Sequence, residues 1–220
     1  MIPSLSYRTF FTGIFIILSF LAGCGSSPPS RMYTLNSLAA PKAADTAAVI
    51  TKDFIVVGIG PLEIPDYLDR PQIVTRTSRN ELKLAEFDLW GSPLASDISR
   101  SLAENLSSLL QGNGIAVLPW RVHIKSRYRM PVGIERFDVT PDSAVILKAR
   151  WGVIEKDSTI PQIVRESVIT RPLKGSQYSE IVAVMSEALN DLSKEMAAGI
   201  KSVIRADGTQ KMEKPGSGGK

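Results

Sequence analysis

The sequence SPLASDISRSLAENLSSLLQ, residues 92–111, carries the clearest secondary-structure signal in this chain of 220 residues. It predicts a helix because Ser92 suits the N-cap and Pro93 suits the first helical position, where a missing N–H costs nothing. Its apolar residues recur at spacings of three and four and form one stripe: Leu94, Ile98, Leu102, Leu106 and Leu109. The run Gly112-Asn113-Gly114 ends the helix with residues that tolerate positive φ. A helix with a single stripe needs one apolar surface to cover, and the rest of the chain must supply it.

The segments on either side of this helix predict strands. Residues 54–59 form a continuous apolar, β-branched run, which is typical of a central strand covered on both faces. Residues 73–78 and 81–89 flank a turn and predict a hairpin, with a bulge near Ala85 that brings its apolar residues into register. Further strands are predicted at 33–35, 115–118, 122–134, 144–154 and 163–170, and a second helix at 177–204.

The order of strands, helix, strands and helix predicts an α+β fold. We expect a two-layer sandwich in which both helices pack on one face of a mostly antiparallel sheet and the other face is open to water or a partner. Residues 54–204 form one domain in this prediction, residues 24–53 form a tether and linker, and residues 205–220 form a disordered tail.

The N-terminus predicts export. Residues 1–23 contain a positive charge at Arg8 and then an apolar run, which is typical of a signal peptide and too short for a spanning helix. The run Leu21-Ala22-Gly23-Cys24 resembles the lipobox of bacterial lipoproteins, which implies that Cys24 is acylated after cleavage. Acyl chains on Cys24 would hold the protein on a membrane. The alternative is an ordinary signal peptide followed by a small buried cysteine.

Composition excludes several classes of function. The formal charge of +4 is too weak to indicate nucleic-acid binding. Cys24 is the only cysteine and His123 the only histidine, so we expect no disulfide, no cysteine or histidine metal site and no cofactor. The chain lacks the Gly-x-Ser-x-Gly motif of a nucleophile elbow. These features predict a protein that is not an enzyme and has no catalytic residues.

The loop that precedes the hairpin is the first candidate site. Residues 60–74, GPLEIPDYLDRPQIV, contain three prolines that restrict the backbone and present side chains at little entropic cost. Aromatic and arginine residues on a rigid loop suit an interface with a partner. The candidate interface residues are Tyr67, Leu68 and Arg70, together with Trp90. The alternative is a packed crossover in which Tyr67 and Leu68 cover the core.

A row of basic residues is the second candidate site. Arg121, His123, Lys125, Arg127 and Arg129 have the same parity and would lie on one face of a strand. Arg121, Lys125, Arg127 and Arg129 could contact anionic lipid or an acidic partner surface. We favour the simpler interpretation of a solvated face with charges that protect a sheet edge, because Pro119-Trp120 suits a loop.

Several segments together resemble the ABC-type transport auxiliary lipoproteins. They are IPDYLDRPQIV (64–74), LKLAEF (82–87), WGSPL (90–94), AENL (103–106), the lipobox and Tyr33-Thr34-Leu35. The resemblance spans residues 21 to about 200, is stronger over 54–110 than after 120, and departs from the family at Gly91-Ser92, where members often carry an acidic residue. It implies a periplasm-facing lipoprotein of an intermembrane transport system. It also implies an MCE-domain protein and an ABC permease and ATPase as partners, and lipid or other hydrophobic cargo.

Three functions remain open at this point. The resemblance favours a non-catalytic docking component, anchored in the outer membrane because Gly25 rather than Asp follows Cys24, which binds an MCE partner or further copies of this chain. The second is a free-standing periplasmic carrier with lipid between sheet and helices. The third, which the motifs disfavour, is a hydrolase that uses His123.

Overall fold

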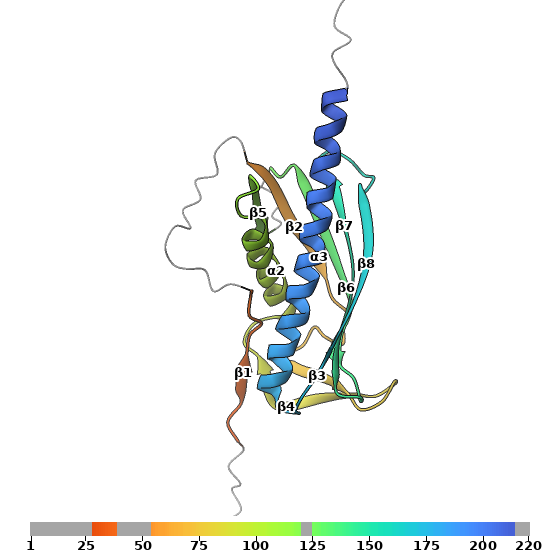
Figure 1. Cartoon of the computed structure of the whole chain (residues 1–220). Coiled ribbons are helices and arrows are strands. Elements are labelled where there is room, and N and C mark those ends of the chain that lie inside the picture. Colours follow the sequence, from red (N-terminus) through yellow and green to blue (C-terminus); the bar gives the residue numbers. More distant parts are fainter. Residues whose placement is uncertain (1–27, 39–53, 120–124, 214–220) are drawn as a thin grey trace, which may run out of the picture. The chain divides into compact units, whose positions relative to one another are not determined.

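The structure is a computed structural model that describes residues 28–38, 54–119 and 125–213 (Figure 1). The chain divides into a unit of residues 1–30 and a compact unit of residues 31–220, and the second unit contains all the described helices and strands. The export signal, Cys24, Arg121 and His123 lie outside the described residues.

Its described elements alternate in the predicted order. The strands are β1 (Arg31–Tyr33), β2 (Ile55–Glu63), β3 (Gln72–Arg76), β4 (Leu82–Trp90), β5 (Ile115–Pro119), β6 (Tyr128–Val139), β7 (Ala144–Glu155) and β8 (Ile163–Pro172). The helices are α2 (Leu94–Leu110) and α3 (Tyr178–Glu213).

The described strands form one mixed sheet of eight, so the predicted α+β class is confirmed. Strands β5, β2, β6, β7 and β8 lie side by side, and β3, β4 and β1 extend the sheet from the far end of β6. The two longest ladders, β6 with β7 and β7 with β8, are antiparallel, whereas β2 pairs in parallel with both β5 and β6. Figure 1 shows α2 and α3 next to each other in front of this sheet, which is the predicted arrangement on one face.

The core lies between the helices and the sheet. Leu94, Ile98, Leu102 and Leu106 of α2 are at most 1 % exposed, as the apolar stripe predicted, and Leu110 takes the last core position instead of Leu109. The alternating residues of β7 face α3: Val145, Leu147, Ala149, Trp151 and Val153. Because a fully buried aliphatic side chain contributes about 2 kcal/mol, this interface supplies much of the stability of the fold.

The strand hairpin contains the predicted bulge. Val74 pairs with Leu84 but Gln72 pairs with Leu89, so β4 carries extra residues opposite Ile73. Ala85 therefore turns into the core while Leu82 and Leu84 stay partly exposed.

Several predicted boundaries are wrong. Helix α2 begins at Leu94 with Pro93 as its N-cap and no capping side chain, so Ser92 does not cap it. Strand β6 begins only at Tyr128. Helix α3 continues to Glu213, beyond the predicted end at residue 204, because Asp207 near its end bonds to residues at the start of β6. At the other end of the chain, β1 and the residues after it pack into the domain, whereas residues 24–53 were predicted to be a tether and linker.

Candidate functional site

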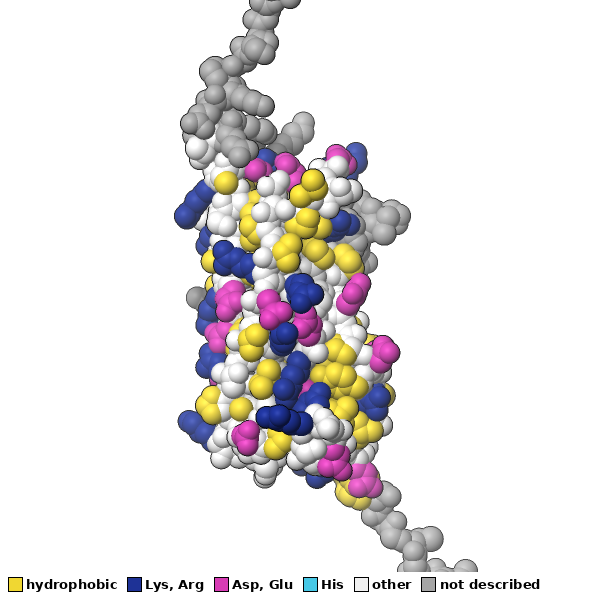
Figure 2. All heavy atoms as spheres, turned by 90° about the vertical axis from the view of Figure 1, so that its right-hand side faces the viewer, with side chains coloured by type: hydrophobic (Ala, Val, Ile, Leu, Met, Phe, Trp, Pro, Cys, Tyr) yellow, Lys and Arg dark blue, Asp and Glu magenta, His cyan; other side chains and the backbone are white. Residues whose placement is uncertain are grey.

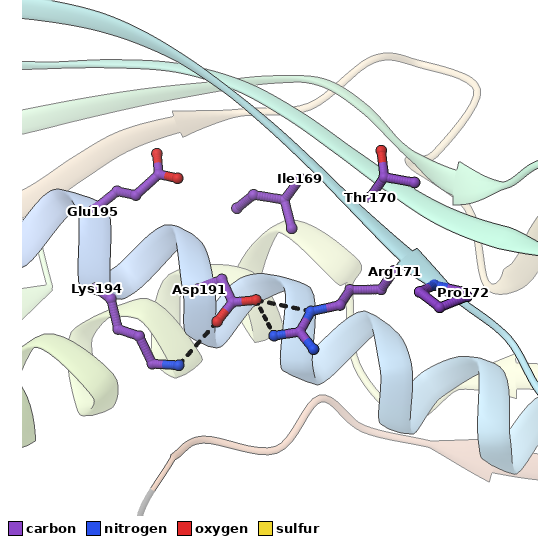
Figure 3. A pocket seen from close by; sticks show the side chains of 7 residues that line it. All are labelled: Ile169, Thr170, Arg171, Pro172, Asp191, Lys194 and Glu195. Atoms are coloured by element: carbon purple, nitrogen blue, oxygen red, sulfur yellow. Dashed lines mark hydrogen bonds and ion pairs between the residues drawn. The ribbon is translucent and has the colours of Figure 1, made fainter.

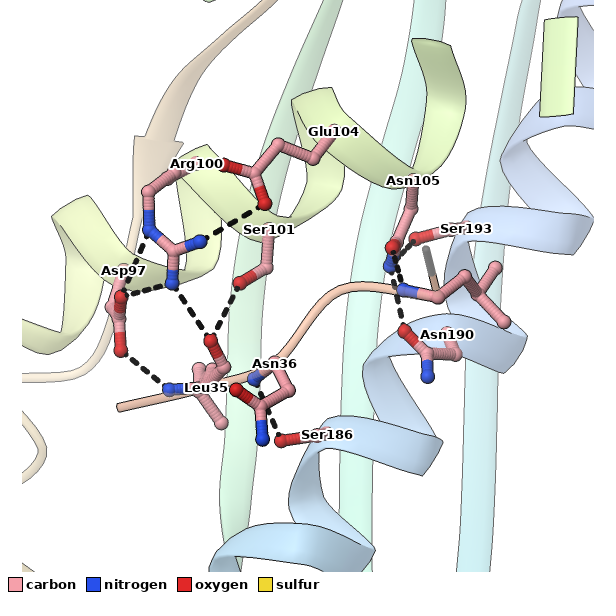
Figure 4. A network of polar contacts seen from close by, with 11 residues as sticks. Leu35, Asn36, Asp97, Arg100, Ser101, Glu104, Asn105, Ser186, Asn190 and Ser193 are labelled. Carbon is pink, nitrogen blue, oxygen red and sulfur yellow. Dashed lines mark hydrogen bonds and ion pairs between the residues drawn. The ribbon is translucent and has the colours of Figure 1, made fainter. Parts of the chain in front are cut away.

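Polar side chains of both helices hold the chain that follows β1. Residues 34–38, which follow β1, cross the helix pair as extended chain (Figure 4). The Leu35 N–H donates to Asp97 Oδ2 at 2.7 Å, and its carbonyl accepts from Arg100 Nη2 at 2.7 Å. The Asn36 N–H donates to Ser186 Oγ at 3.0 Å. This segment is therefore fixed through its backbone by side chains of both helices.

Buried polar side chains on the helix faces are explained by this segment. Asn105, which is fully buried, accepts from the Leu38 N–H at 2.6 Å and donates to Asn190 Oδ1 at 2.8 Å and Ser193 Oγ at 3.0 Å. A buried polar group without a hydrogen-bond partner would lower the stability of the fold by about 1–3 kcal/mol. The packing of Asn105 between the helices and the docking of Leu38 therefore depend on each other. The sequence contains a signal for them, since Asp97, Ser101 and Asn105 recur every four residues beside the apolar stripe, but it does not show their partner.

Strand β1 is also held by an ion pair. Asp88 of β4 accepts a hydrogen bond from Tyr33 at 2.8 Å and forms a salt bridge with Arg31 at 2.8 Å. Burial raises the pKa of Asp88, but the hydrogen bonds from Arg31 and Tyr33 outweigh burial and hold this pKa below its ordinary value. The start of the folded domain is thus tied to the sheet immediately after residue 30.

The loop between β2 and β3 packs against the end of β6. Tyr67 donates to Asp138 Oδ2 at 3.0 Å, and the Arg76 guanidinium lies 5.5 Å from the centre of the Tyr67 ring. Asp138 is fully buried and also accepts from Arg76 and Arg136 at 2.9 and 2.8 Å. Burial and the Asp138 carboxylate raise the pKa of Tyr67, so its phenol remains a hydrogen-bond donor.

The structure separates the four predicted interface residues. Leu68 is 2 % exposed and Trp90 is 6 % exposed, so both side chains lie in the core of this chain. Tyr67 and Arg70 are half-buried, and the Nε of Arg70 is buried without a hydrogen-bond partner among the described residues. A partner can therefore reach this loop through Tyr67 and Arg70, whereas Leu68 and Trp90 support the loop from below. A role of all four in binding stays a prediction.

The predicted basic row is only partly a strand. Lys125 is exposed and precedes β6, and Arg129 is half-buried within it. Arg127 lies 5.2 Å from the centre of the Tyr128 ring and forms ion pairs with Asp207 and Glu155 at 3.4 and 3.8 Å. The Arg127 charge therefore helps to attach the end of α3 to the sheet, and a contact of this row with lipid or a partner stays a prediction.

An open depression of about 640 Å³ lies on the surface where the edge strand β8 meets α3 (Figure 3). Asp191 accepts from Arg171 Nε at 2.8 Å and from Lys194 Nζ at 2.9 Å. Burial raises the pKa of Asp191, but its bonds to Lys194 and Arg171 lower it below the ordinary value. Both cations are already paired here, so the arrangement stabilises the contact of β8 with α3 and leaves little charge for a ligand.

Within residues 28–38, 54–119 and 125–213, no group of three or more His, Cys, Asp or Glu side chains is arranged to hold a metal ion. Of the helices in those same residues, none has both the length and the apolar character needed to cross a bilayer.

Comparisons with known proteins match this chain along most of its length. A relative from Escherichia coli (strain K12), the intermembrane transport lipoprotein PqiC, is 26 % identical over 182 residues, which cover 82 % of this chain and 92 % of that protein. A protein of the same name from Shigella flexneri matches equally well. A crystal structure of a protein from Xanthomonas campestris has a TM-score of 0.64 at 17 % identity and covers 82 % of this chain and 99 % of its own.

Another crystal structure, of an uncharacterized protein, has a TM-score of 0.65 at 22 % identity and covers 79 % of this chain and 99 % of its own. At these identities the two solved structures support the fold alone. The family model described as "ABC-type transport auxiliary lipoprotein component" matches residues 33–197, from the end of β1 to the middle of α3. The chain therefore belongs to the family of ABC-type transport auxiliary lipoproteins.

Proposed function

We propose that this protein is a non-catalytic docking component of an intermembrane lipid transport system. In this proposal it is anchored in the outer membrane through acylated Cys24, faces the periplasm and binds the MCE-domain protein of an ABC-type transporter. The observation that carries the proposal is the family match over residues 33–197, which coincides with the folded domain. The name of the PqiC relative, an intermembrane transport lipoprotein, supports the same role.

The attachment of residues 34–38 fits an anchored component. Six residues separate Cys24 from Arg31, and the seven steps of chain between these two Cα atoms span at most roughly 25 Å. From Arg31 onward the chain is held by Asp88 of β4 and then by polar side chains of α2 and α3. A pull on the lipid anchor is thereby transmitted to the sheet and both helices, and the domain stays close to the membrane that holds it.

The packing of the core favours docking over free lipid carriage. A carrier with cargo between sheet and helices needs space there, but side chains of both layers fill this interface. Leu102 and Leu106 of α2, Leu192 and Ile200 of α3, and Leu147 of β7 are all 0 % exposed. Native mass spectrometry of the Cys24→Ser protein tests the alternative: co-purified phospholipid would support a carrier, and a clean protein mass supports docking.

Pull-down of the MCE-domain protein tests the docking role. We expect the full-length protein to retain this partner in membranes, and we expect Cys24→Ser to leave the membrane fraction while its domain stays folded. In the proposed interface, the double change of Tyr67 and Arg70 to Ala should weaken the pull-down. Unchanged pull-down would remove these residues from the interface, whereas a wild-type protein without any transport partner would contradict the function itself.

A further inference from the structure

A groove of about 550 Å³ crosses the sheet face that the helices leave open. It runs over β2, β6, β7 and β8 and is lined mainly by apolar side chains: Pro61, Ile64, Pro131, Ile154, Pro161 and Val164. Val164 is 60 % exposed, and Ile160 in the adjoining turn is 74 % exposed. Contact of such large apolar side chains with water is unfavourable, and an occupant that covers them gains free energy. The groove therefore favours an apolar occupant.

Two glycines make this face hollow. Gly133 of β6 pairs with Glu63 on one side and with Arg150 on the other. Because neighbouring strands lie about 4.8 Å apart, Glu63 and Arg150 stand roughly 10 Å apart with no side chain between them. Gly152 of β7 lies opposite Val164 of β8 and likewise adds no side chain to this face. The hollow therefore results from the absence of side chains at these two positions, and no change of side-chain rotamer at either position can close it.

The charges beside the groove are unevenly paired. Arg150 forms ion pairs with Glu135 and Glu166 at 3.0 and 3.3 Å, and Lys148 pairs with the same two carboxylates at 2.8 and 3.4 Å. Figure 2 shows the molecule from the β8 side, where Lys or Arg and Asp or Glu side chains lie among apolar side chains. Glu63, in contrast, has no ion-pair partner within the described ranges. The groove thus presents apolar walls and one uncompensated carboxylate.

We propose that the groove binds a peptide segment of a partner protein that is apolar and carries a Lys or Arg opposite Glu63. A phospholipid fits less well, because Glu63 repels its phosphate and the nearby cations are already paired. An apolar segment with one basic residue satisfies both the walls and the carboxylate. This inference rests on the proposed docking function, and it places the binding surface on the open sheet face.

Two variants separate the groove from the fold. Gly133→Leu fills the groove, and a Cβ at this position comes no closer than 3.9 Å to another residue, at the Arg150 carbonyl, so the strand tolerates it. Gly152 is less suitable, since its Cβ would lie 2.9 Å from the Ile163 carbonyl. Glu63→Lys reverses the charge at the rim. Val168→Phe is the matched control, because it adds bulk on the same face of β8 outside the groove lining.

A photo-crosslinking amino acid at Val164 of the full-length protein, in its own membranes, reports the occupant. We expect an adduct that maps to an apolar peptide of another protein with a Lys or Arg nearby. Its yield should fall about tenfold or more in Gly133→Leu and in Glu63→Lys and stay unchanged in Val168→Phe. Thermal unfolding of each variant confirms that the fold is intact.

The other outcomes overturn the inference. An adduct with phospholipid, an adduct with a second copy of this chain, no adduct, or equal yields in all variants each contradict it. Co-purification of transport components distinguishes this failure from failure of the proposed function. If these components remain with Gly133→Leu and Glu63→Lys, only the groove assignment is wrong, whereas their absence from the wild-type protein would contradict the function.

Discussion

The contact of α3 with β7 allows a stability prediction that rests on a single added carbon atom. Gly199 of α3 lies against the ring of Trp151, and a Cβ at this position would approach Trp151 Cη2 and Cζ3 to 2.5 and 2.8 Å. The ring cannot easily move away, because it is 1 % exposed and its Nε1 donates to Ser167 Oγ at 2.9 Å. Gly199→Ala should therefore displace Trp151 or the helix.

The expected magnitude combines opposing effects. Overpacking of a core costs about 1–3 kcal/mol, and a weakened Trp151 hydrogen bond adds about 1 kcal/mol. Alanine regains about 1 kcal/mol over glycine in a helix interior. We expect Gly199→Ala to lower the free energy of unfolding by about 2 kcal/mol, or the melting temperature by roughly 4–8 °C for a domain of this size. Thermal unfolding followed by circular dichroism measures the change.

Two controls test the cause. Gly208 lies on the same helix with no atom within 4 Å of a built Cβ, so Gly208→Ala should be neutral or slightly stabilising. Trp151→Phe removes both clashing ring atoms, and in that background Gly199→Ala should cost much less. An equal cost in the Trp and Phe backgrounds, or a Gly199→Ala protein as stable as the wild type, would refute the packing argument.

Three further predictions concern the polar contacts. Asp97→Ala leaves the buried Leu35 N–H without an acceptor and should lower the free energy of unfolding by about 1–3 kcal/mol, with faster amide exchange at Leu35 than in Asp97→Asn. The pKa of Asp88 is lowered in the folded state, so its stabilisation is complete at neutral pH and is lost as pH falls below about 4. Asp88→Asn should flatten the dependence of stability on pH there. Tyr67→Phe removes the bond to Asp138 and should cost about 1 kcal/mol in chemical unfolding; no loss would show that this bond contributes nothing.

Periodicity alone predicted the elements that cover the core. The stripe from Leu94 to Leu106 and the alternation in β7 both follow from burial on one face, so the helices, the strands and the α+β class could be derived. Boundaries were less accurate where tertiary contacts decide them. Helix α3 continues past residue 204 because Asp207 bonds to Arg127 and Tyr128, a contact that local sequence does not reveal.

Periodicity does not predict the buried polar contacts between the helices and the segment after β1, nor the groove on the open sheet face. Leu35 and Asp97 are far apart in the sequence, and nothing near either residue indicates that they meet. Trp90 and Leu68 suited an exposed anchor by residue type, but their neighbours in three dimensions bury them. The groove depends on the cross-strand pairing of Gly133 and Gly152, which requires the register of the sheet.

Affinity purification of the full-length acylated protein from its own membranes, followed by mass spectrometry, tests the central claim most directly. The proposed function predicts that an MCE-domain protein and components of an ABC-type transporter accompany it. An eluate that contains only this lipoprotein and bound lipid would contradict a docking role and favour a free-standing carrier.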